Sequence, residues 1–162
     1  MKPALPKGVA MFQIEAIGHV RGGRSEPVDD KWADERARIV LDPKRFSTES
    51  LLGLTEFSHA EIIFVFDRLP VSEIVAGARH PRGRTDWPKI GVFAQRGRNR
   101  PNRLGISVCR IVGVIGLSLT VEGLDAIDGT PVLDIKPVLR GFLPRGEVRE
   151  PEWAAEIMKD YW

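Results

Sequence analysis

Arginine is concentrated in one stretch of this chain, and its side chain is well suited to bind phosphate or carboxylate. Between Arg79 and Arg103 lie seven arginines and one lysine, opposed only by Asp86. The planar guanidinium holds two oxygens of such a group through parallel hydrogen bonds. A solvated basic loop has the same composition, so the stretch is either plain surface or an anion-binding surface for nucleic acid. The arginines that we expect to contact nucleic acid are Arg82, Arg84, Arg98, Arg100 and Arg103.

Three aspartates gather in a second stretch, further along the chain. Asp128 precedes Gly129 in a dipeptide typical of hairpin turns, where the aspartate side chain can bond nearby backbone. Asp134 and Lys136 would share one face of a strand and could pair. Only Asp125 lacks an evident structural role, so it is the candidate catalytic residue.

Other chemistries find little support. Cys109 is the only cysteine, so no internal disulfide forms and a cysteine-based metal site is not expected. His19, His59 and His80 show neither HxH nor HxxH spacing, so we expect no metal. His59 opens an apolar run and is expected to be a hydrogen-bonded histidine at the start of a strand. GxSxG, Walker A and kinase motifs are absent from the sequence.

The elements that would position these residues are mostly strands. Short runs rich in Val, Ile and Phe are bounded by Gly, Pro, Asp or Asn. We expect strands at 13–20, 37–42, 60–67, 89–94, 106–114, 117–123 and 132–138. Only 43–54 and 151–161 look helical, the second with a proline at its start. Strands at short spacing with few helices predict a mainly β fold, either a barrel or a sandwich, with short helices and a C-terminal helix.

The length of the chain suits one domain with its own core. We expect a single domain over 1–162, with a core barrel at about 13–140 and a C-terminal helical tail at 151–162. A doubly wound nucleotide-binding fold would need crossover helices and a GxGxxG motif after the first strand, and the sequence has neither. The basic segment 69–88 is expected to be a functional or mobile loop. We find no signal peptide and no apolar run long enough for a membrane span, and therefore expect a soluble cytoplasmic protein.

Several blocks of the chain resemble the TsaA-like (TrmO-type) family of S-adenosylmethionine-dependent tRNA N6-adenosine methyltransferases. The blocks are Ile17-Gly18, Leu51–His59, Phe64–Phe66, Gly91–Arg96, Arg100–Asn102, Leu104–Ser107 and Leu124–Pro137. They follow one another in the family's order and cover most of residues 14–138. Because so many blocks agree in order and spacing, the resemblance is highly specific.

The resemblance implies a β-barrel protein that forms homodimers, with the 79–88 loop of one subunit near the cofactor pocket of the other. It implies methylation of N6 of a threonylcarbamoyl-modified adenosine at tRNA position 37, with S-adenosylmethionine as methyl donor and tRNA as partner. Because the sulfonium already activates the methyl group, such an enzyme mainly aligns the acceptor and excludes water, without a metal. Carried over by motif, the cofactor-binding residues are Trp32, Arg68, Leu69, Arg96, Ile106, Gly123, Leu124, Asp125 and Ala126.

Two segments depart from the family pattern. Residues 24–33 read Arg-Ser-Glu-Pro-Val-Asp-Asp-Lys-Trp-Ala, where the tRNA enzymes carry a Ser-Pro pair and a Pro-Arg-Gln stretch. Residues 95–100 read Gln-Arg-Gly-Arg-Asn-Arg, where the family usually has Thr-Arg-Ser-Pro. Two alternatives therefore stay open: the same cofactor with a non-tRNA or small-molecule acceptor, or a non-catalytic module that binds S-adenosylmethionine or RNA. Because Arg96 follows the apolar run 91–94, we expect the barrel to fix its backbone.

Overall fold

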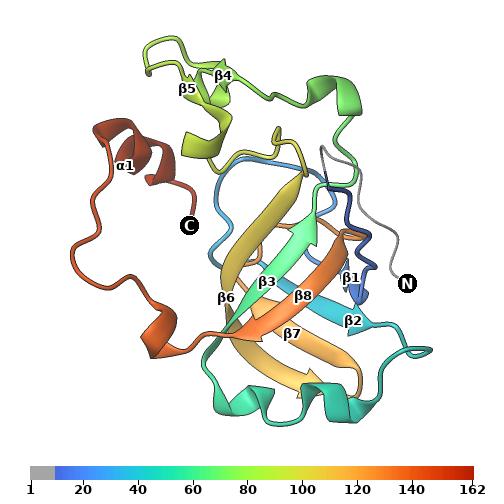
Figure 1. The fold of residues 1–162 in the computed structure, drawn as a ribbon. Helices are drawn as coiled ribbons and strands as arrows, with labels where there is room; N and C mark the ends of the chain where they lie inside the picture. Colours follow the sequence, from blue (N-terminus) through green and yellow to red (C-terminus); the bar gives the residue numbers. More distant parts are fainter. Residues whose placement is uncertain (1–9) are drawn as a thin grey trace.

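The computed structural model describes residues 10–162 and contains a closed barrel of six antiparallel strands (Figure 1). Around the barrel the strands follow the order β1-β2-β7-β6-β3-β8. They are β1 (Gly18–Arg21), β2 (Arg36–Leu41), β3 (His59–Val65), β6 (Leu104–Ile115), β7 (Ser118–Glu122) and β8 (Pro131–Pro137). This arrangement confirms the mainly β fold and selects the barrel over the sandwich.

Alternation of side chains explains the barrel wall. Along β3 and β7, and through the first half of β6, every second residue is buried, as the two-residue period of a strand requires. The inward side chains form one core, in which Ile39, Ile62, Phe64 and Leu119 are almost fully buried. Gly105 leaves room for the Phe64 ring, since a Cβ at this position would lie 2.4 Å from Phe64 Cε2. The interior is therefore filled by side chains and is not a channel.

Five of the barrel strands lie within two residues of their predicted limits. The first strand is shorter than the predicted range 13–20, because only Gly18–Arg21 pairs with β2. Ile14, in the part that does not pair, is 64% exposed. Extending the strand from Gly18 back to Gln13 would bury little apolar surface, because side chains such as Ile14 face solvent. The hydrogen-bond ladder between β1 and β2 therefore begins at Gly18.

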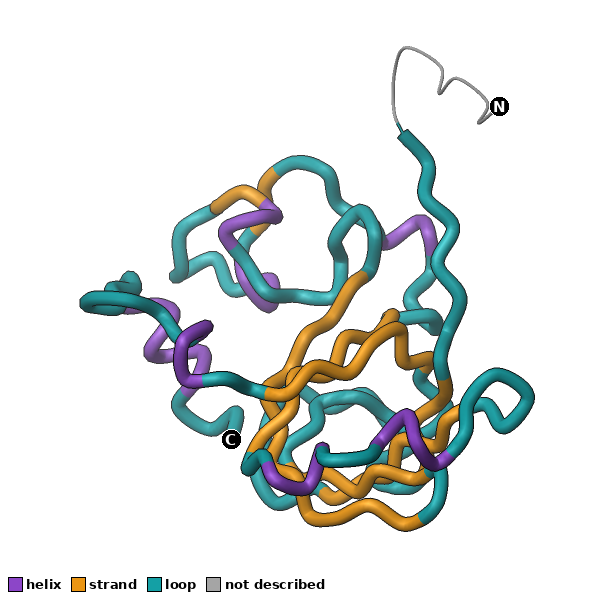
Figure 2. The backbone as a smooth tube through the Cα atoms, turned by 60° about the horizontal axis from the view of Figure 1, so that its bottom comes forward, coloured by secondary structure: helices purple, strands orange, loops and turns teal. Residues whose placement is uncertain are grey.

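Residues 66–103, here called the outer arm, stand apart from the ring of strands (Figures 1 and 2). The arm contains η3 (Val71–Glu73), β4 (Ala78–Arg79), η4 (Pro81–Gly83), β5 (Ile90–Gly91) and η5 (Val92–Ala94). The predicted strand at 89–94 is wrong in extent, because only Ile90–Gly91 pairs, with β4. Phe93 is 79% exposed, and the Gln95 amide donates to the carbonyls of Arg79 and Ile90. The chain turns at η5 because no strand of residues 10–162 pairs with Val92–Ala94.

The predicted helix at 43–54 is also wrong. Two 3-10 turns, η1 (Thr48–Leu51) and η2 (Leu54–Glu56), take its place, and they cross the end of the barrel that Figure 2 brings forward. Gly53 between them has a left-handed backbone, with φ 82°. A residue in this conformation ends a right-handed helix, so the segment folds as two separate turns.

Residues 138–162, here called the C-terminal tail, carry η6 (Arg140–Phe142) and α1 (Glu152–Met158). The predicted helix at 151–161 exists but ends at Met158, and Lys159–Tyr161 form turns instead. Helix α1 lies beside the outer arm (Figure 1), where Trp87 Nε1 donates to Glu156 Oε2 at 2.6 Å. Among residues 10–162, none of the helices has the length and apolar character needed to cross a bilayer.

Candidate functional site

One end of the barrel collects most of the residues that the sequence singles out. Strands β3 and β7 end there and β6 and β8 begin there, because consecutive strands run antiparallel. The loops that join these strands therefore meet above the same rim. They bring Arg68 and the segment 123–126 to the rim at which β6 begins with Ile106 among its first residues, although these residues lie far apart in the sequence.

Asp125 is the central polar group at this rim. Ser107 Oγ donates a hydrogen bond to its Oδ1, and the Tyr161 hydroxyl donates to its Oδ2. Leu124 and Ala126, on either side, are buried in the core, so the barrel fixes the backbone that carries the carboxylate. Asp125 therefore joins β6 to the C-terminal tail, a structural role that its place in the sequence does not indicate.

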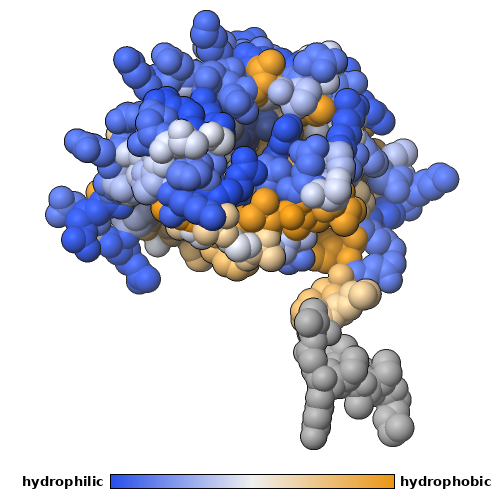
Figure 3. Space-filling view, turned by 90° about the horizontal axis from the view of Figure 1, so that it is seen from above, coloured by the Kyte–Doolittle hydropathy of each residue, from blue (hydrophilic) through white to orange (hydrophobic). Residues whose placement is uncertain are grey.

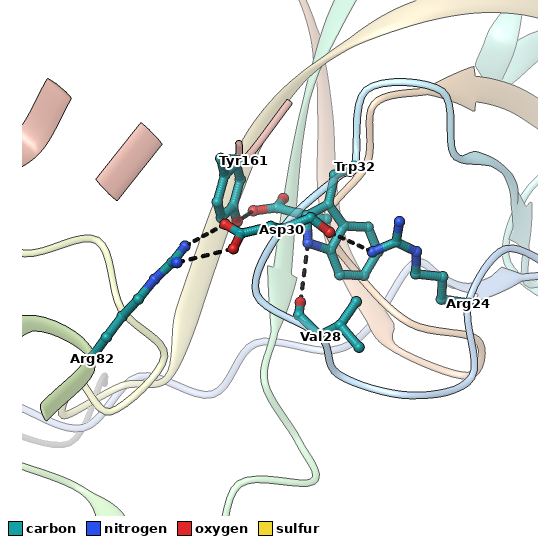
Figure 4. A network of polar contacts seen from close by, with 7 residues as sticks. Arg24, Val28, Asp30, Trp32, Arg82 and Tyr161 are labelled. Atoms are coloured by element: carbon teal, nitrogen blue, oxygen red, sulfur yellow. Dashed lines mark hydrogen bonds and ion pairs between the residues drawn. The ribbon is translucent and has the colours of Figure 1, made fainter. Parts of the chain in front are cut away.

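Residues 22–35, which join β1 to β2 and are here called the early loop, meet the C-terminal tail where Tyr161 lies beside Asp30 and Trp32 (Figure 4). The backbone amides of Lys31 and Trp32 donate to the carbonyls of Asp160 and Tyr161 at 2.9 and 2.8 Å. The Trp32 indole is 3% exposed, donates to Val28 O at 3.2 Å, and stacks under the Arg24 guanidinium at 4.4 Å. The segment 24–33, where the family pattern is lost, is therefore ordered by contacts within this chain.

Arg82 and Arg84, two of the predicted RNA contacts, are engaged inside the molecule. Arg82 forms two hydrogen bonds with Asp30, at 2.7 and 3.1 Å (Figure 4), and this partner raises the pKa of the guanidinium. Arg84 pairs with Asp86 and lies 4.0 Å from the centroid of the Trp87 ring. Arg82 thus links the outer arm to residues 22–35, whereas Arg84 is held by partners inside the arm, so both guanidinium groups already have an acidic partner.

Arg100 and Arg103 hold the loop on which they lie. Arg100 Nη2 donates to Gln95 O at 3.0 Å, and Arg103 Nη1 donates to Leu69 O at 3.2 Å. Of the five predicted RNA contacts, only the exposed side chain of Arg98 makes no polar contact with residues 10–162. Among these five arginines, only Arg98 therefore has a guanidinium without a partner in residues 10–162.

The two arginines predicted to bind cofactor lie over neighbouring parts of the rim. Arg96 Nη2 donates to Ile106 O at 3.0 Å, and Arg68 Nη2 donates to Asp128 O at 3.1 Å. Both guanidinium groups are exposed and keep donors that these bonds do not use. The expectation that the barrel fixes the Arg96 backbone is wrong, because η5 precedes Arg96 and lies in the outer arm. The side-chain bond to β6 positions Arg96 instead.

The remaining predicted residues form the apolar and backbone part of the rim. Leu69 is buried, whereas Ile106 is half exposed on the outer face of β6. Gly123 has φ 82°, a left-handed conformation that favours glycine, and its amide donates to Glu35 O at 3.0 Å. The early loop thereby reaches the segment 123–126 directly.

Two titratable groups beside Asp125 are held in their neutral forms. Burial, together with the charge of Asp125, raises the pKa of the Cys109 thiol to about 12. Burial, followed by the charge of Asp125 and the hydrogen bond to it, raises the pKa of Tyr161. Tyr161 is therefore a protonated donor at neutral pH, and Cys109 is no thiolate nucleophile. Within residues 10–162, we find no group of three His, Cys, Asp or Glu that could hold a metal ion.

The surface formed by residues 10–162 has two well-defined hollows near the barrel ends. One of about 690 Å³ is lined by the single segment Gly23–Lys31 without Pro27, and so flanks the rim without including Arg96 or Asp125. The other, of about 520 Å³, lies between the turns at 46–57 and β8 and has a mainly apolar lining. Neither coincides with the predicted cofactor residues, which gather by hydrogen bonds around the rim rather than around a closed cavity.

The fold and the site define a closed β-barrel protein with a polar site built from loops at one rim. The family described as tRNA-methyltransferase O N-terminal domain matches residues 23–142, and the chain belongs to this family. That match confirms the family inferred from the sequence blocks.

Curated relatives and solved structures agree with this membership. A human tRNA (adenine(37)-N6)-methyltransferase is 38% identical over 116 residues, which are 72% of this chain and 25% of that protein. A probable S-adenosyl-L-methionine-binding protein of Pyrococcus abyssi is 40% identical over 145 residues, 86% of this chain and 73% of that protein. The crystal structure of TrmO from Pseudomonas aeruginosa superposes with a TM-score of 0.72 at 29% identity, over 91% of this chain and 63% of that one. The match thus spans only a quarter of the human relative.

Proposed function

We propose that this protein is an S-adenosylmethionine-dependent methyltransferase that methylates N6 of adenosine at tRNA position 37, in its threonylcarbamoyl-modified form. The observation that carries the proposal is the rim itself. It places a carboxylate, Asp125, and two guanidinium groups, Arg68 and Arg96, beside buried apolar residues in a chain of this family. With tRNA as its substrate, the protein would act in the cytoplasm, and we include this location in the proposal.

The residues at the rim fit the chemistry of this cofactor. S-adenosylmethionine carries a carboxylate, which suits Arg68 or Arg96, and an ammonium group and hydroxyls, which suit Asp125. Its adenine needs an apolar surface, which the half-exposed side chain of Ile106 offers. The left-handed turn at Gly123 lets backbone approach a ligand closely.

When bound, the cofactor supplies a methyl group activated by the sulfonium. The chain's own task is to hold the acceptor nitrogen in line and to keep water out. The acceptor nitrogen must also lose a proton, and Asp125 is our candidate to accept it. Each Asp125 oxygen accepts one hydrogen bond, from Ser107 or Tyr161, and keeps a further lone pair.

A second candidate function keeps the cofactor and changes the acceptor to a small molecule or another nucleic acid. The pairing of Arg82 with Asp30 and of Arg84 with Asp86 favours this alternative, because it withdraws two cations from the surface available to tRNA. Of the basic stretch, the exposed side chains of Arg98 and Lys89 remain for phosphate contact.

We also propose a homodimer through the outer face of β3 and β6. Leu104, Ile106 and Val108 point outward and are 38–50% exposed, and Ile63 pairs with Ile106 across the two strands. Seen from above, hydrophobic residues gather along one side of an otherwise hydrophilic surface (Figure 3). An apolar stripe on a barrel wall is typical of an interface. Residues 79–88 contact the early loop of their own chain through Arg82. In this dimer, the 79–88 loop beside each cofactor site therefore belongs to the same subunit as the site.

Calorimetry with S-adenosylmethionine tests the cofactor. We expect binding that survives a chelator, and an affinity loss of about 1.5–3 kcal/mol for Arg96→Ala, because a charge-assisted hydrogen bond is removed. The matched control is Arg98→Ala, which should leave the affinity unchanged. A protein that does not bind the cofactor at millimolar concentration would contradict the proposal, and transfer of labelled methyl to a small molecule instead of tRNA would select the second candidate.

A further inference from the structure

The C-terminal tail enters the site at one residue, Tyr161. Its hydroxyl donates to Asp125 Oδ2, while its carbonyl accepts the Trp32 amide at 2.8 Å. Asp125 and Trp32 are both predicted cofactor contacts, and they lie on segments that are far apart in sequence. A single tail residue therefore holds two parts of the proposed site (Figure 4).

The tail reaches this place through contacts that do not depend on the hydroxyl. Lys31 N donates to Asp160 O at 2.9 Å, and Trp87 Nε1 donates to Glu156 Oε2 at 2.6 Å. The indole of Trp87 is buried, so losing its partner would leave a buried donor unsatisfied. The phenol of Tyr161 is thus presented to Asp125 from an anchored segment.

Rotation of the Asp125 side chain is the freedom that remains. Its backbone is fixed by buried Leu124 and Ala126, but a carboxylate rotates readily about its last torsion. Ser107 holds one oxygen from β6, and Tyr161 holds the other from the tail. Because both oxygens are held, the lone pairs that accept no hydrogen bond point in a fixed direction relative to the rim.

We propose that Tyr161 is a positioning residue for the cofactor site, whose hydroxyl fixes the Asp125 carboxylate in the orientation that binds S-adenosylmethionine. The C-terminal tail is then a wall of the site and not an appendage of the barrel. This inference rests on the proposed function and adds to it a residue outside the segment 23–142 that the family model covers.

The test measures the dissociation constant of S-adenosylmethionine by calorimetry for Tyr161→Phe, Asp125→Asn and the double variant. We expect Tyr161→Phe to raise the constant about fivefold to tenfold, because one charge-assisted hydrogen bond no longer orients the carboxylate. In the Asp125→Asn background, the same change should have no further effect. Lys159→Ala, on an exposed tail residue, is the matched control and should bind as the wild type does.

Hydrogen exchange supplies a readout independent of the cofactor. The amides of Lys31 and Trp32 should stay protected in Tyr161→Phe, because their acceptors are backbone carbonyls of the tail. An unchanged dissociation constant, an equal loss in the Asp125→Asn background, or lost protection at these amides would each overturn the inference and leave the proposed function standing. Absence of binding by the wild type would overturn both.

Discussion

The barrel and the layer above its rim are held together by different forces. Strand ladders and a buried apolar core hold the barrel. The outer arm and the C-terminal tail are joined to it and to each other mainly by single side-chain contacts, such as Arg82 to Asp30 and Trp87 to Glu156. Ladders and cores are cooperative, whereas single contacts can break one at a time. The site lies where the two regions meet, so one half of it is rigid and the other half is adjustable.

Deleting a core side chain should cause the largest effect. Phe64 is 1% exposed inside the barrel, so we expect Phe64→Ala to lower the free energy of unfolding by about 3–5 kcal/mol. Phe93→Ala in the outer arm is the matched control, because that ring is 79% exposed and should matter by less than about 0.5 kcal/mol. Urea unfolding of both variants measures the difference. Equal losses would mean that the arm is as integral to stability as the barrel.

A contact between arm and tail should have a smaller and local effect. Glu156→Ala leaves the Trp87 indole N–H without its acceptor, which should ease opening of the tail by about 1–3 kcal/mol. Hydrogen exchange should report faster exchange at Lys31 and Trp32, with little change in the barrel strands. Glu150→Ala is the control, because this glutamate of the tail is exposed and precedes α1. Faster exchange throughout the barrel would contradict the separation of the two regions.

Arg98, an exposed arginine of the outer arm, should contribute to the salt dependence of RNA binding. If Arg98 contacts a phosphate, Arg98→Ala should reduce the slope of log affinity against log salt by about 0.7–0.9, the value for one released counterion. Arg84→Ala is the control, since this arginine is already paired with Asp86. A slope that changes for Arg84 but not for Arg98 would reverse our assignment of the basic surface.

An ion pair on the barrel wall should give the smallest effect, and one with a defined pH dependence. Hydrogen bonds from Arg110 and Arg36 lower the pKa of Glu122 in the folded state. When the folded state lowers the pKa of a carboxyl group, the group stabilises the protein at pH values above its unfolded-state pKa. This stabilisation is lost as the pH falls through the folded-state pKa. Wild type should therefore be slightly more stable than Glu122→Gln at neutral pH, and the gap should close as the pH falls below the lowered pKa of Glu122. Added salt should narrow it at neutral pH.

The sequence revealed the barrel better than the layer above it. Strand periodicity located the barrel strands, and the predicted pairing of Asp134 with Lys136 is confirmed, at 3.3 Å. This pair depends on the two-residue period of a strand, which a local pattern records. Asp128 lies in a turn as predicted, but its Oδ1 accepts the amide of Gly22, 106 residues away, and not that of nearby backbone.

Roles that depend on distant segments were not visible. Tyr161 meets Asp125 across 36 residues, and Arg82 meets Asp30 across 52. No spacing rule connects such pairs, so a local pattern predicts neither the bonds of Tyr161 and Ser107 to Asp125 nor the pairing of Arg82 with Asp30. The only signal for Tyr161 was that it is the single tyrosine of the chain, which by itself indicates no partner.

The pairing of β1 with β8 bears on how the chain reaches its native state. These strands meet through Gly18–Val132 and His19–Pro131, which are far apart in sequence, whereas β6 and β7 are joined by the tight turn at Gly116. Short loops close early and long ones late, because loop closure costs entropy before contacts repay it. We therefore expect the β6–β7 hairpin to form first and the β1–β8 seam last. Above that seam, Asp128 N donates to Arg24 O at 2.7 Å and Gly129 N to Val20 O at 2.8 Å, so the early loop reaches the rim in the same slow step that completes the barrel.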